Sequence, residues 1–249
     1  MDRIHSALAA ILAGLLLGGC TANEAIVASI ASDARPEADI ANDAGRKPEE
    51  TLRFFAIQQG DDVLDVFGGG GYYTELVSRI VGSNGSVALY NNAAWDRFVG
   101  AQVAERLAGD RLSNVEYLVG KHGTLPRARY DAAIFVLGMH DLYYEDPDNG
   151  WVGIDRRAFL KSVFDSLKPG GTLGIVDHNA APGSGASAAR TLHRIEPALL
   201  TADLEAAGFA LDATSGHLRN SEDDYSRTVF DPALRWKSDR SVMRFRKPL

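Results

Sequence analysis

The sequence has a single cysteine, Cys20, in 249 residues, which excludes a scaffold held together by disulfides. It also lacks any long run of lysine or arginine, and its 26 basic residues are outnumbered by 33 acidic ones, for a net charge of −7. Because such a chain repels a phosphate backbone, we predict a small-molecule substrate and no nucleic-acid partner. With 45% hydrophobic and 24% charged residues, the composition is that of a globular protein with one sizeable core.

The N-terminal hydrophobic stretch is too short to cross a membrane. It runs from Ala7 to Leu17 and ends in Gly18-Gly19-Cys20, whereas a spanning helix needs about 20 apolar residues and a secretory signal about 7–15. Small residues directly before the cysteine resemble the lipobox of bacterial lipoproteins. We therefore predict a signal peptide over residues 1–19, lipid attachment and a membrane anchor at Cys20, and a location in the cell envelope facing the periplasm. An uncleaved apolar anchor is the alternative.

The rest of the chain divides into a leader and one domain. Residues 20–46 are rich in Ala, Asp and Asn, and we predict a tether with one short helix over residues 24–31. Residues 47–249 alternate short apolar strands with helices, a pattern typical of an α/β fold with a mostly parallel sheet covered on both faces. We expect strands at 63–67, 86–90, 115–119, 131–137, 172–177, 209–214 and 242–246, and helices at 48–57, 72–81, 93–107, 155–167 and 197–207.

Four consecutive glycines, Gly68–Gly71, follow the first expected strand. In open parallel sheets, ligands bind beyond the carboxyl ends of the strands. Glycines let the backbone approach a ligand closely, and the amides at the start of the next helix attract a carboxylate or phosphate. The glycines indicate a binding loop, although a tight turn between strand and helix is the alternative.

Three segments resemble motifs of the class I S-adenosylmethionine-dependent methyltransferases, and they occur in that family's order. Residues 63–74 (VLDVFGGGGYYT) resemble the first motif, residues 130–135 (YDAAIF) the fourth-strand motif, and residues 167–173 (LKPGGTL) the approach to the fifth strand. The resemblance implies a Rossmann-like three-layer sandwich with a seven-stranded, mostly parallel sheet and an antiparallel last strand. It further implies methyl transfer from S-adenosylmethionine to an unknown small-molecule or envelope acceptor.

The same resemblance assigns the cofactor site to residues that follow the first four strands. Asn91 stands where the family commonly has an acid that binds the ribose hydroxyls, and its amide oxygen can still accept a hydrogen bond. Lys121 stands where an acid often binds the adenine amine, and it can only donate. The expected cofactor-binding residues are Asp65, Phe67, Gly68, Gly69, Gly70, Gly71, Asn91, His122 and Leu137.

Histidines follow two neighbouring strands, at points that should face one cleft. His140 comes after the fourth strand and His178 after the fifth. An imidazole titrates near neutral pH, so we predict His140 as the general base, oriented by Asp141 or Asp177, with His178 as the second candidate. A hydrogen-bonded structural role is the alternative for each histidine.

The acceptor site is expected next to these histidines. His193 and Arg194 would bind an anionic group, and the acidic loop 145–150 would form a lid between aromatic side chains. We predict no metal, because no His-x-x-x-His spacing is present. The histidines and aspartates named for this cleft (His140, Asp141, Asp177, His178 and His193) nevertheless include the ligand types of a two-histidine, one-carboxylate site. The predicted substrate-binding residues are Tyr143, Tyr144, Asp177, His193 and Arg194.

Two functions remain open at this point. The first is a lipid-anchored methyltransferase that uses S-adenosylmethionine. The second is a non-catalytic methyltransferase-like lipoprotein that binds a nucleoside or another small ligand, which the missing acids at Asn91 and Lys121 would favour.

Overall fold

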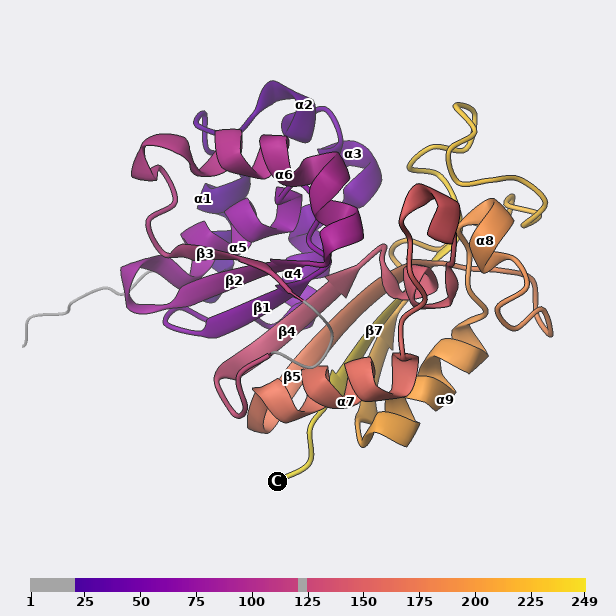
Figure 1. Cartoon of the computed structure of the whole chain (residues 1–249). Helices are drawn as coiled ribbons and strands as arrows, with labels where there is room; N and C mark the ends of the chain where they lie inside the picture. Colours follow the sequence, from indigo (N-terminus) through magenta and orange to yellow (C-terminus); the bar gives the residue numbers. More distant parts are fainter. Residues whose placement is uncertain (1–20, 121–124) are drawn as a thin grey trace, which may run out of the picture.

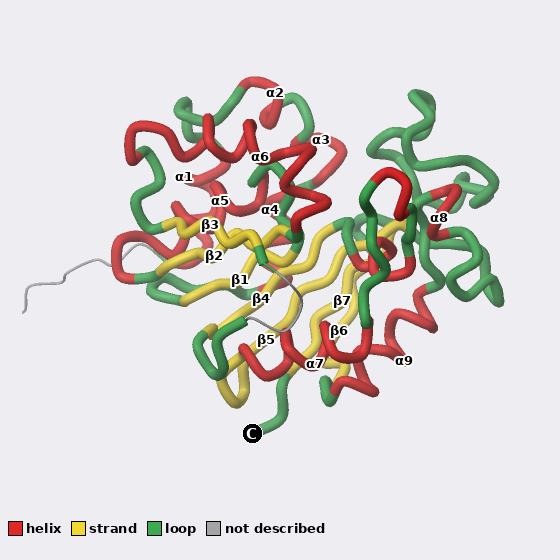
Figure 2. Tube along the Cα trace, viewed as in Figure 1, coloured by secondary structure: helices red, strands yellow, loops and turns green. Residues whose placement is uncertain are grey.

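The structure is a computed structural model that describes residues 21–120 and 125–249. Its strands are β1 (Asp62–Val66), β2 (Ser86–Asn91), β3 (Val115–Val119), β4 (Tyr130–Val136), β5 (Leu167–His178), β6 (Ala210–Ser215) and β7 (Arg240–Arg246). They form one sheet in the order β3-β2-β1-β4-β5-β7-β6, shown as a continuous yellow layer in Figure 2. β1 pairs in parallel with β2 and β4, and β7 runs antiparallel to β5 and β6. The predicted fold class is confirmed.

Helices cover both faces of the sheet (Figure 1). The helices are α1 (Ala22–Ile30), α2 (Glu37–Ile40), α3 (Asp43–Arg46), α4 (Pro48–Phe55), α5 (Tyr72–Val81), α6 (Ala93–Leu107), α7 (Arg156–Ser166), α8 (Ala189–Leu192) and α9 (Pro197–Ala207). Successive strand side chains point to opposite faces. Val63 and Ile134 therefore pack with α1, α4 and α5, whereas Leu64 and Phe135 pack with α7 and α9. Two cores hold the sheet rigid and fix the carboxyl ends of its parallel strands.

Residues 21–46 are part of the folded domain, so the prediction of a tether is wrong for them. The expected helix exists as α1, but it packs on α5 through Ala25 and Ile26, which are buried. The Ser29 hydroxyl also donates to the Leu76 carbonyl oxygen at 2.8 Å. Only a few apolar residues make this contact, which is why composition alone suggested a loose segment.

The predicted signal peptide, residues 1–19, and the predicted lipid attachment site, Cys20, lie outside the described residues. In the part of the chain that the structure describes, no helix has the length and apolar character needed to span a bilayer.

The fifth strand begins earlier than predicted. Helix α7 ends at Ser166, and β5 starts at once with Leu167 instead of Thr172. The reason lies in pairing on both sides: Leu167 pairs with Tyr130 of β4, the Gly170 N–H donates to the Lys247 carbonyl oxygen, and the Lys247 N–H donates to that of Gly171. The Lys-Pro-Gly-Gly segment thus ends the helix and also extends the strand.

Candidate active site

The loop Gly68–Gly71 joins β1 to α5, and its backbone conformation requires glycine. Gly69 has a φ of 58° and Gly71 a φ of 87°, in the left-handed region that side chains disfavour. A Cβ atom on Gly68 would lie 2.6 Å from Asp65 Oδ2. The Gly71 N–H donates to the Gly68 carbonyl oxygen at 3.0 Å, which closes the turn. The loop therefore presents bare main chain at the carboxyl end of β1.

A cavity of about 380 Å³ lies against this loop, and we call it the glycine-loop cavity. Gly68, Gly69 and Gly70 line one side. Residues near α2 and α3 line the opposite side, so the N-terminal helices help to close it. Its size is within the range of about 300–1,000 Å³ typical of small-molecule sites.

Arg46, at the end of α3, is a cationic group of this cavity that sequence analysis missed. Its guanidinium carbon lies 4.3 Å from the centre of the Tyr72 ring and 4.2 Å from that of Trp236. Burial lowers its pKa, and its Nε is buried without a hydrogen-bond partner among the described residues. Arg46 thus places a positive charge at the wall of the glycine-loop cavity. No sequence signal pointed to it, because residues 20–46 looked like a tether.

Asp65 lies beneath the loop as predicted from the motif. Its carboxylate accepts a hydrogen bond from the Thr74 hydroxyl at 2.6 Å. Burial raises the pKa of Asp65 to about 7, against a usual value of 3.8. Asp65 thus ties β1 to α5 and lines the glycine-loop cavity at the same time.

Asn91 does not take the role that its sequence position suggested. Its side-chain oxygen accepts from the Gly69 N–H at 3.1 Å, and its amide nitrogen donates to the Gly69 carbonyl oxygen at 3.0 Å. The side chain is fully buried and does not line the glycine-loop cavity. Asn91 therefore holds the loop in place, and the prediction that it contacts a ribose is corrected.

Phe67 and Leu137 line the glycine-loop cavity without filling it. The Phe67 ring turns into the core and stacks on Phe159 with centroids 5.2 Å apart. Both Phe67 and Leu137 have positive φ values, 48° and 59°, at the ends of β1 and β4. The predicted cofactor residue His122 lies outside the described residues.

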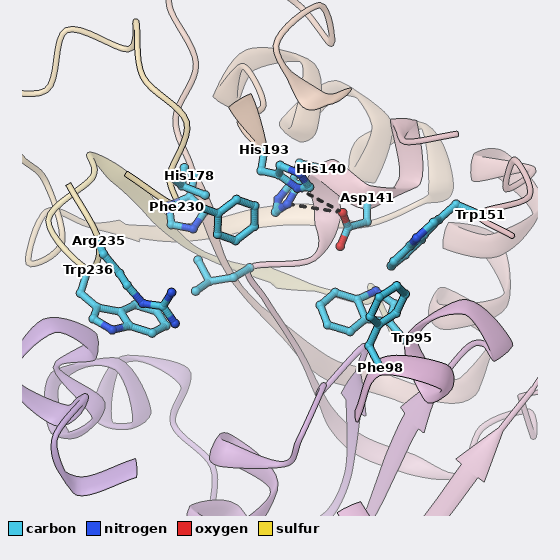
Figure 3. A pocket seen from close by; sticks show the side chains of 12 residues that line it. Trp95, Phe98, His140, Asp141, Trp151, His178, His193, Phe230, Arg235 and Trp236 are labelled. Carbon is cyan, nitrogen blue, oxygen red and sulfur yellow. Dashed lines mark ion pairs between the residues drawn. The ribbon is translucent and has the colours of Figure 1, made fainter. Parts of the chain in front are cut away.

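A second cavity of about 390 Å³ adjoins the first, and Figure 3 shows its lining side chains. We call it the aromatic cavity, because Trp95, Phe98, Trp151, Phe230 and Trp236 line it. Its polar groups are His140, Asp141, His178, His193 and Arg235. Trp95, Leu137, Arg235 and Trp236 line both cavities, so the two spaces share a boundary.

His140 is held by Asp177 at the bottom of the aromatic cavity. Its Nδ1 lies 2.8 Å from Asp177 Oδ1, and its main-chain N–H donates to Asp177 Oδ2 at 2.9 Å. Burial alone would lower the pKa of His140, but the Asp177 and Asp141 carboxylates raise it to about 9. His140 therefore holds a proton at neutral pH, which argues against the predicted role of general base.

Burial is the main cause of the pKa shifts of Asp141, His178 and His193 in the aromatic cavity. Burial raises the pKa of Asp141 to about 6, and burial together with the His140 charge lowers that of His193 to about 4. The pKa of His178 is also lowered by burial, and its Nδ1 lies 2.7 Å from the Ser238 hydroxyl. At neutral pH these two imidazoles are neutral.

Four of the predicted substrate-binding residues do not line the aromatic cavity: Tyr143, Tyr144, Asp177 and Arg194. Asp177 sits behind His140, as described above. The Tyr143 hydroxyl donates to Asp203 instead. Arg194 is fully buried and forms an ion pair with Asp223 at 2.9 Å, so it has no free group for a substrate.

The remaining substrate prediction, His193, lies at the cavity. His193 lines it, and the Tyr144 ring stacks on His193 with centroids 5.6 Å apart. Trp151, at the end of the predicted lid loop, stacks on Phe98 at 5.6 Å and places that loop beside α6. The aromatic walls other than Trp151 were not predicted, because they come from α6 and from residues 229–236, which carry no recognisable motif.

Comparisons with known proteins identify similar chains. No family model matches. The "Ubiquinone/menaquinone biosynthesis C-methyltransferase UbiE" of Haemophilus ducreyi is 28% identical over 129 residues, which cover 51% of this chain and 45% of that protein. Its counterpart in Legionella pneumophila (strain Corby) is 30% identical over 128 residues, covering 51% and 46%. The chain thus spans less than half the length of these curated relatives.

Solved structures agree over most of the chain. A methyltransferase from Aquifex aeolicus, described as dependent on S-adenosylmethionine, superposes with a TM-score of 0.60 at 20% identity, covering 85% of this chain and 95% of that one. A second, from Mesorhizobium loti, gives 0.55 at 14% identity, covering 80% and 97%. The chain therefore has the fold of the class I S-adenosylmethionine-dependent methyltransferases.

Proposed function

We propose that this protein transfers a methyl group from S-adenosylmethionine to an acceptor held in the aromatic cavity. The observation that carries the proposal is the pair of adjoining cavities, one with bare main chain and a half-buried cation, the other with aromatic walls and a polar floor. A donor and an acceptor held side by side are the arrangement that methyl transfer needs, because alignment supplies much of the rate.

The residues of the glycine-loop cavity fit S-adenosylmethionine. Its carboxylate would pair with Arg46, whose Nε lacks a partner among the described residues. The glycines allow close approach of the cofactor, since Gly68, Gly69 and Gly70 line the cavity without side chains. When bound, the cofactor supplies an electrophilic methyl group on a sulfonium. The chain's own residues bind it, orient it and exclude water.

The aromatic cavity supports an apolar, aromatic acceptor. Trp95, Phe98 and Trp151 form its walls near α6. Flat rings favour stacked or edge-to-face contacts with other aromatic rings. The relatives in Haemophilus and Legionella are named as C-methyltransferases of ubiquinone and menaquinone biosynthesis, which supports an aromatic acceptor here as well.

A binding protein without turnover is the second candidate. Two observations favour it: Asn91 occupies the place of the usual acid and is committed to Gly69, and His140 already holds a proton. Such a protein would bind S-adenosylmethionine or S-adenosylhomocysteine and release no methylated product.

Calorimetric titration of the purified protein with both compounds tests the cofactor site. Saturable binding of either is expected, and no binding at millimolar concentration would overturn the proposal. Incubation with methyl-labelled S-adenosylmethionine and a panel of phenols and quinols then separates the candidates. Label in an acceptor supports the enzyme, and binding without any transfer supports the second candidate.

The lipid anchor at Cys20 and the periplasm-facing location are also part of this proposal, supported by the residues before Cys20. Fractionation of cells that express Cys20→Ser tests the anchor. The variant should leave the membrane fraction, and persistence there would contradict acylation and favour an uncleaved apolar anchor.

A further inference from the structure

We infer that His140, Asp141 and His193 form a binding site for a divalent transition-metal ion in the floor of the aromatic cavity. The three residues come from two separate places, the segment after β4 and the end of α8. The fold brings one ligand atom of each within 4.8 Å of the other two. Sequence spacing did not predict this site, because His193 is more than fifty residues away from the other two.

The distances between ligand atoms suit a metal ion. His140 Nε2 lies 3.4 Å from Asp141 Oδ1, and His193 Nδ1 lies 3.9 Å from the same oxygen. Bonds of about 2.0–2.2 Å in a tetrahedral zinc site place neighbouring ligand atoms roughly 3.3–3.5 Å apart. The distance between His140 Nε2 and Asp141 Oδ1 already has this length. The other two distances between ligand atoms are longer but within 4.8 Å, so side-chain rotations that move these atoms by about an ångström would shorten them to the same value. Figure 3 shows both imidazoles directed at the Asp141 carboxylate.

The surroundings fix the direction of both imidazoles. Asp177 accepts at Nδ1 of His140, which leaves Nε2 directed toward Asp141, where a bound ion would displace the Nε2 proton. A carboxylate behind a ligating histidine is the common arrangement at protein metal sites, because it sets the tautomer and the ring direction. The His193 ring is held between Tyr144 at 5.6 Å and Phe230 at 4.7 Å. These contacts orient His140 Nε2 and His193 Nδ1 toward Asp141 before any ion binds.

The type of metal follows from the ligands. Two imidazoles and one carboxylate on one side of an ion suit zinc and other first-row divalent metals, and they leave positions open. The open positions would face the aromatic cavity, where all three ligand residues are part of the lining. An oxygen of the acceptor is the natural occupant, and this part rests on the proposed function. The binding of the metal ion by the three residues does not depend on the proposed function.

A network of ion pairs without metal is the competing interpretation. It needs only that the Asp141 carboxylate balance the charge of His140. His178 helps to separate the two, because it lines the same cavity but its Nδ1 is engaged by Ser238 and its ring centre lies 6.1 Å from that of His140. The metal site predicts that His193 is needed for metal binding and His178 is not.

Titration of the metal-stripped, tag-free protein with Co²⁺ tests the site, followed by visible absorption and by metal analysis after gel filtration. The wild type should bind one equivalent with a visible absorption band. His193→Gln and Asp141→Asn should lose that equivalent and the band. His178→Gln should keep both, as should His217→Gln, which removes a histidine that pairs with Ser215 and Thr51 instead.

Circular dichroism and urea unfolding establish that each variant is folded, and the affinity for S-adenosylhomocysteine is measured separately in the presence of a chelator. Equal cobalt binding by the wild type and by folded His193→Gln and Asp141→Asn would overturn the inference, as would no binding by the folded wild type. The chelator experiment also separates the two proposals. Loss of S-adenosylhomocysteine binding concerns the proposed function alone, and loss of cobalt binding concerns the metal site alone.

Discussion

The two adjoining cavities are built from different parts of the chain. The glycine-loop cavity has main chain on one side, provided by a run of glycines that are neighbours in sequence. The aromatic cavity is made of side chains that come from α6, from the ends of β4 and β5, from the end of α8 and from residues 229–236. The comparison teaches that the glycine wall of one cavity is encoded locally, whereas the rest of that cavity and the whole of the aromatic cavity depend on how distant segments pack.

Because the aromatic cavity depends on packing between distant segments, removing a buried contact that supports it should lower the stability of the protein. Arg194→Met removes such a contact and should cause the greatest loss of stability among these substitutions. Arg194 is fully buried and holds Asp223 at 2.9 Å and 3.0 Å, tying residues 216–239 to the end of β5. Removing one partner of a buried pair leaves an uncompensated charge and costs about 3–5 kcal/mol. Urea unfolding should show this loss.

Arg227→Met is the matched control, because Arg227 pairs with Asp231 at 3.7 Å on the surface. Its loss of stability should be below about 1 kcal/mol. Equal effects of the two substitutions would mean that Arg194 does not support the aromatic cavity.

Asp65 gives the glycine-loop cavity a pH dependence of its own. Burial raises the pKa of Asp65 from 3.8 to about 7 in the folded protein. Between pH 3.8 and about 7, the Asp65 carboxyl holds a proton in the folded state that it has lost in the unfolded state. The contribution of Asp65 to the free energy of unfolding therefore falls as the pH rises and stops changing above about pH 7. Asp65→Asn should remove this pH-dependent loss of stability, because an amide does not ionise.

The stability gained by Asp65→Asn should therefore grow from near zero below pH 4 to several kcal/mol above pH 7, with about 4 kcal/mol as the upper bound. Urea unfolding of both proteins across this pH range measures the difference. A difference that does not change with pH would contradict the raised pKa.

Gly69→Val should abolish cofactor binding while the aromatic cavity stays intact. A Cβ on Gly69 lies 3.7 Å from Trp95 Cζ3 and enters the glycine-loop cavity. We expect the affinity for S-adenosylhomocysteine to fall by at least about 100-fold, which corresponds to roughly 2.7 kcal/mol. Calorimetry measures the change.

Gly60→Val serves as the control for backbone strain. Gly60 also has a positive φ, 85°, but nothing lies within 4 Å of its added Cβ. Each variant should lose about 1–3 kcal/mol of stability from strain, and only Gly69→Val should lose affinity. Retained binding in Gly69→Val would show that the ligand does not rest on the loop.

Arg46→Gln should have the smallest effect of the four, because it removes one charged partner of the ligand. A hydrogen bond between charged groups contributes about 1.5–3 kcal/mol, so affinity for S-adenosylhomocysteine should fall roughly 10- to 100-fold. 5′-Methylthioadenosine lacks the carboxylate, and its affinity should not change. A parallel loss for both compounds would place Arg46 in a structural role.

Much of the fold was predictable because its signals are local. The Gly68–Gly71 loop lies between β1 and α5 as expected, and each expected strand exists. Tertiary pairing decided the exceptions. β5 begins at Leu167 because Leu167 pairs with Tyr130 and because Gly170 and Gly171 pair with Lys247. Residues 21–46 fold because α1 packs on α5.

The candidate site was predictable only where position alone decides it. The ends of β4 and β5 bring His140 and Asp177 together, as their places in the sequence suggested. Asn91 lies at the expected register, but its hydrogen bonds go to Gly69. Arg46 and Trp236 carried no signal, since their importance arises from a contact between the two ends of the chain.

A structure of the protein in complex with S-adenosylhomocysteine tests the central claim most directly. We expect the ligand in the glycine-loop cavity, with its main body against Gly68–Gly71, its carboxylate on Arg46 and its sulfur directed toward the aromatic cavity. A ligand bound elsewhere, or one whose carboxylate points away from Arg46, would contradict it.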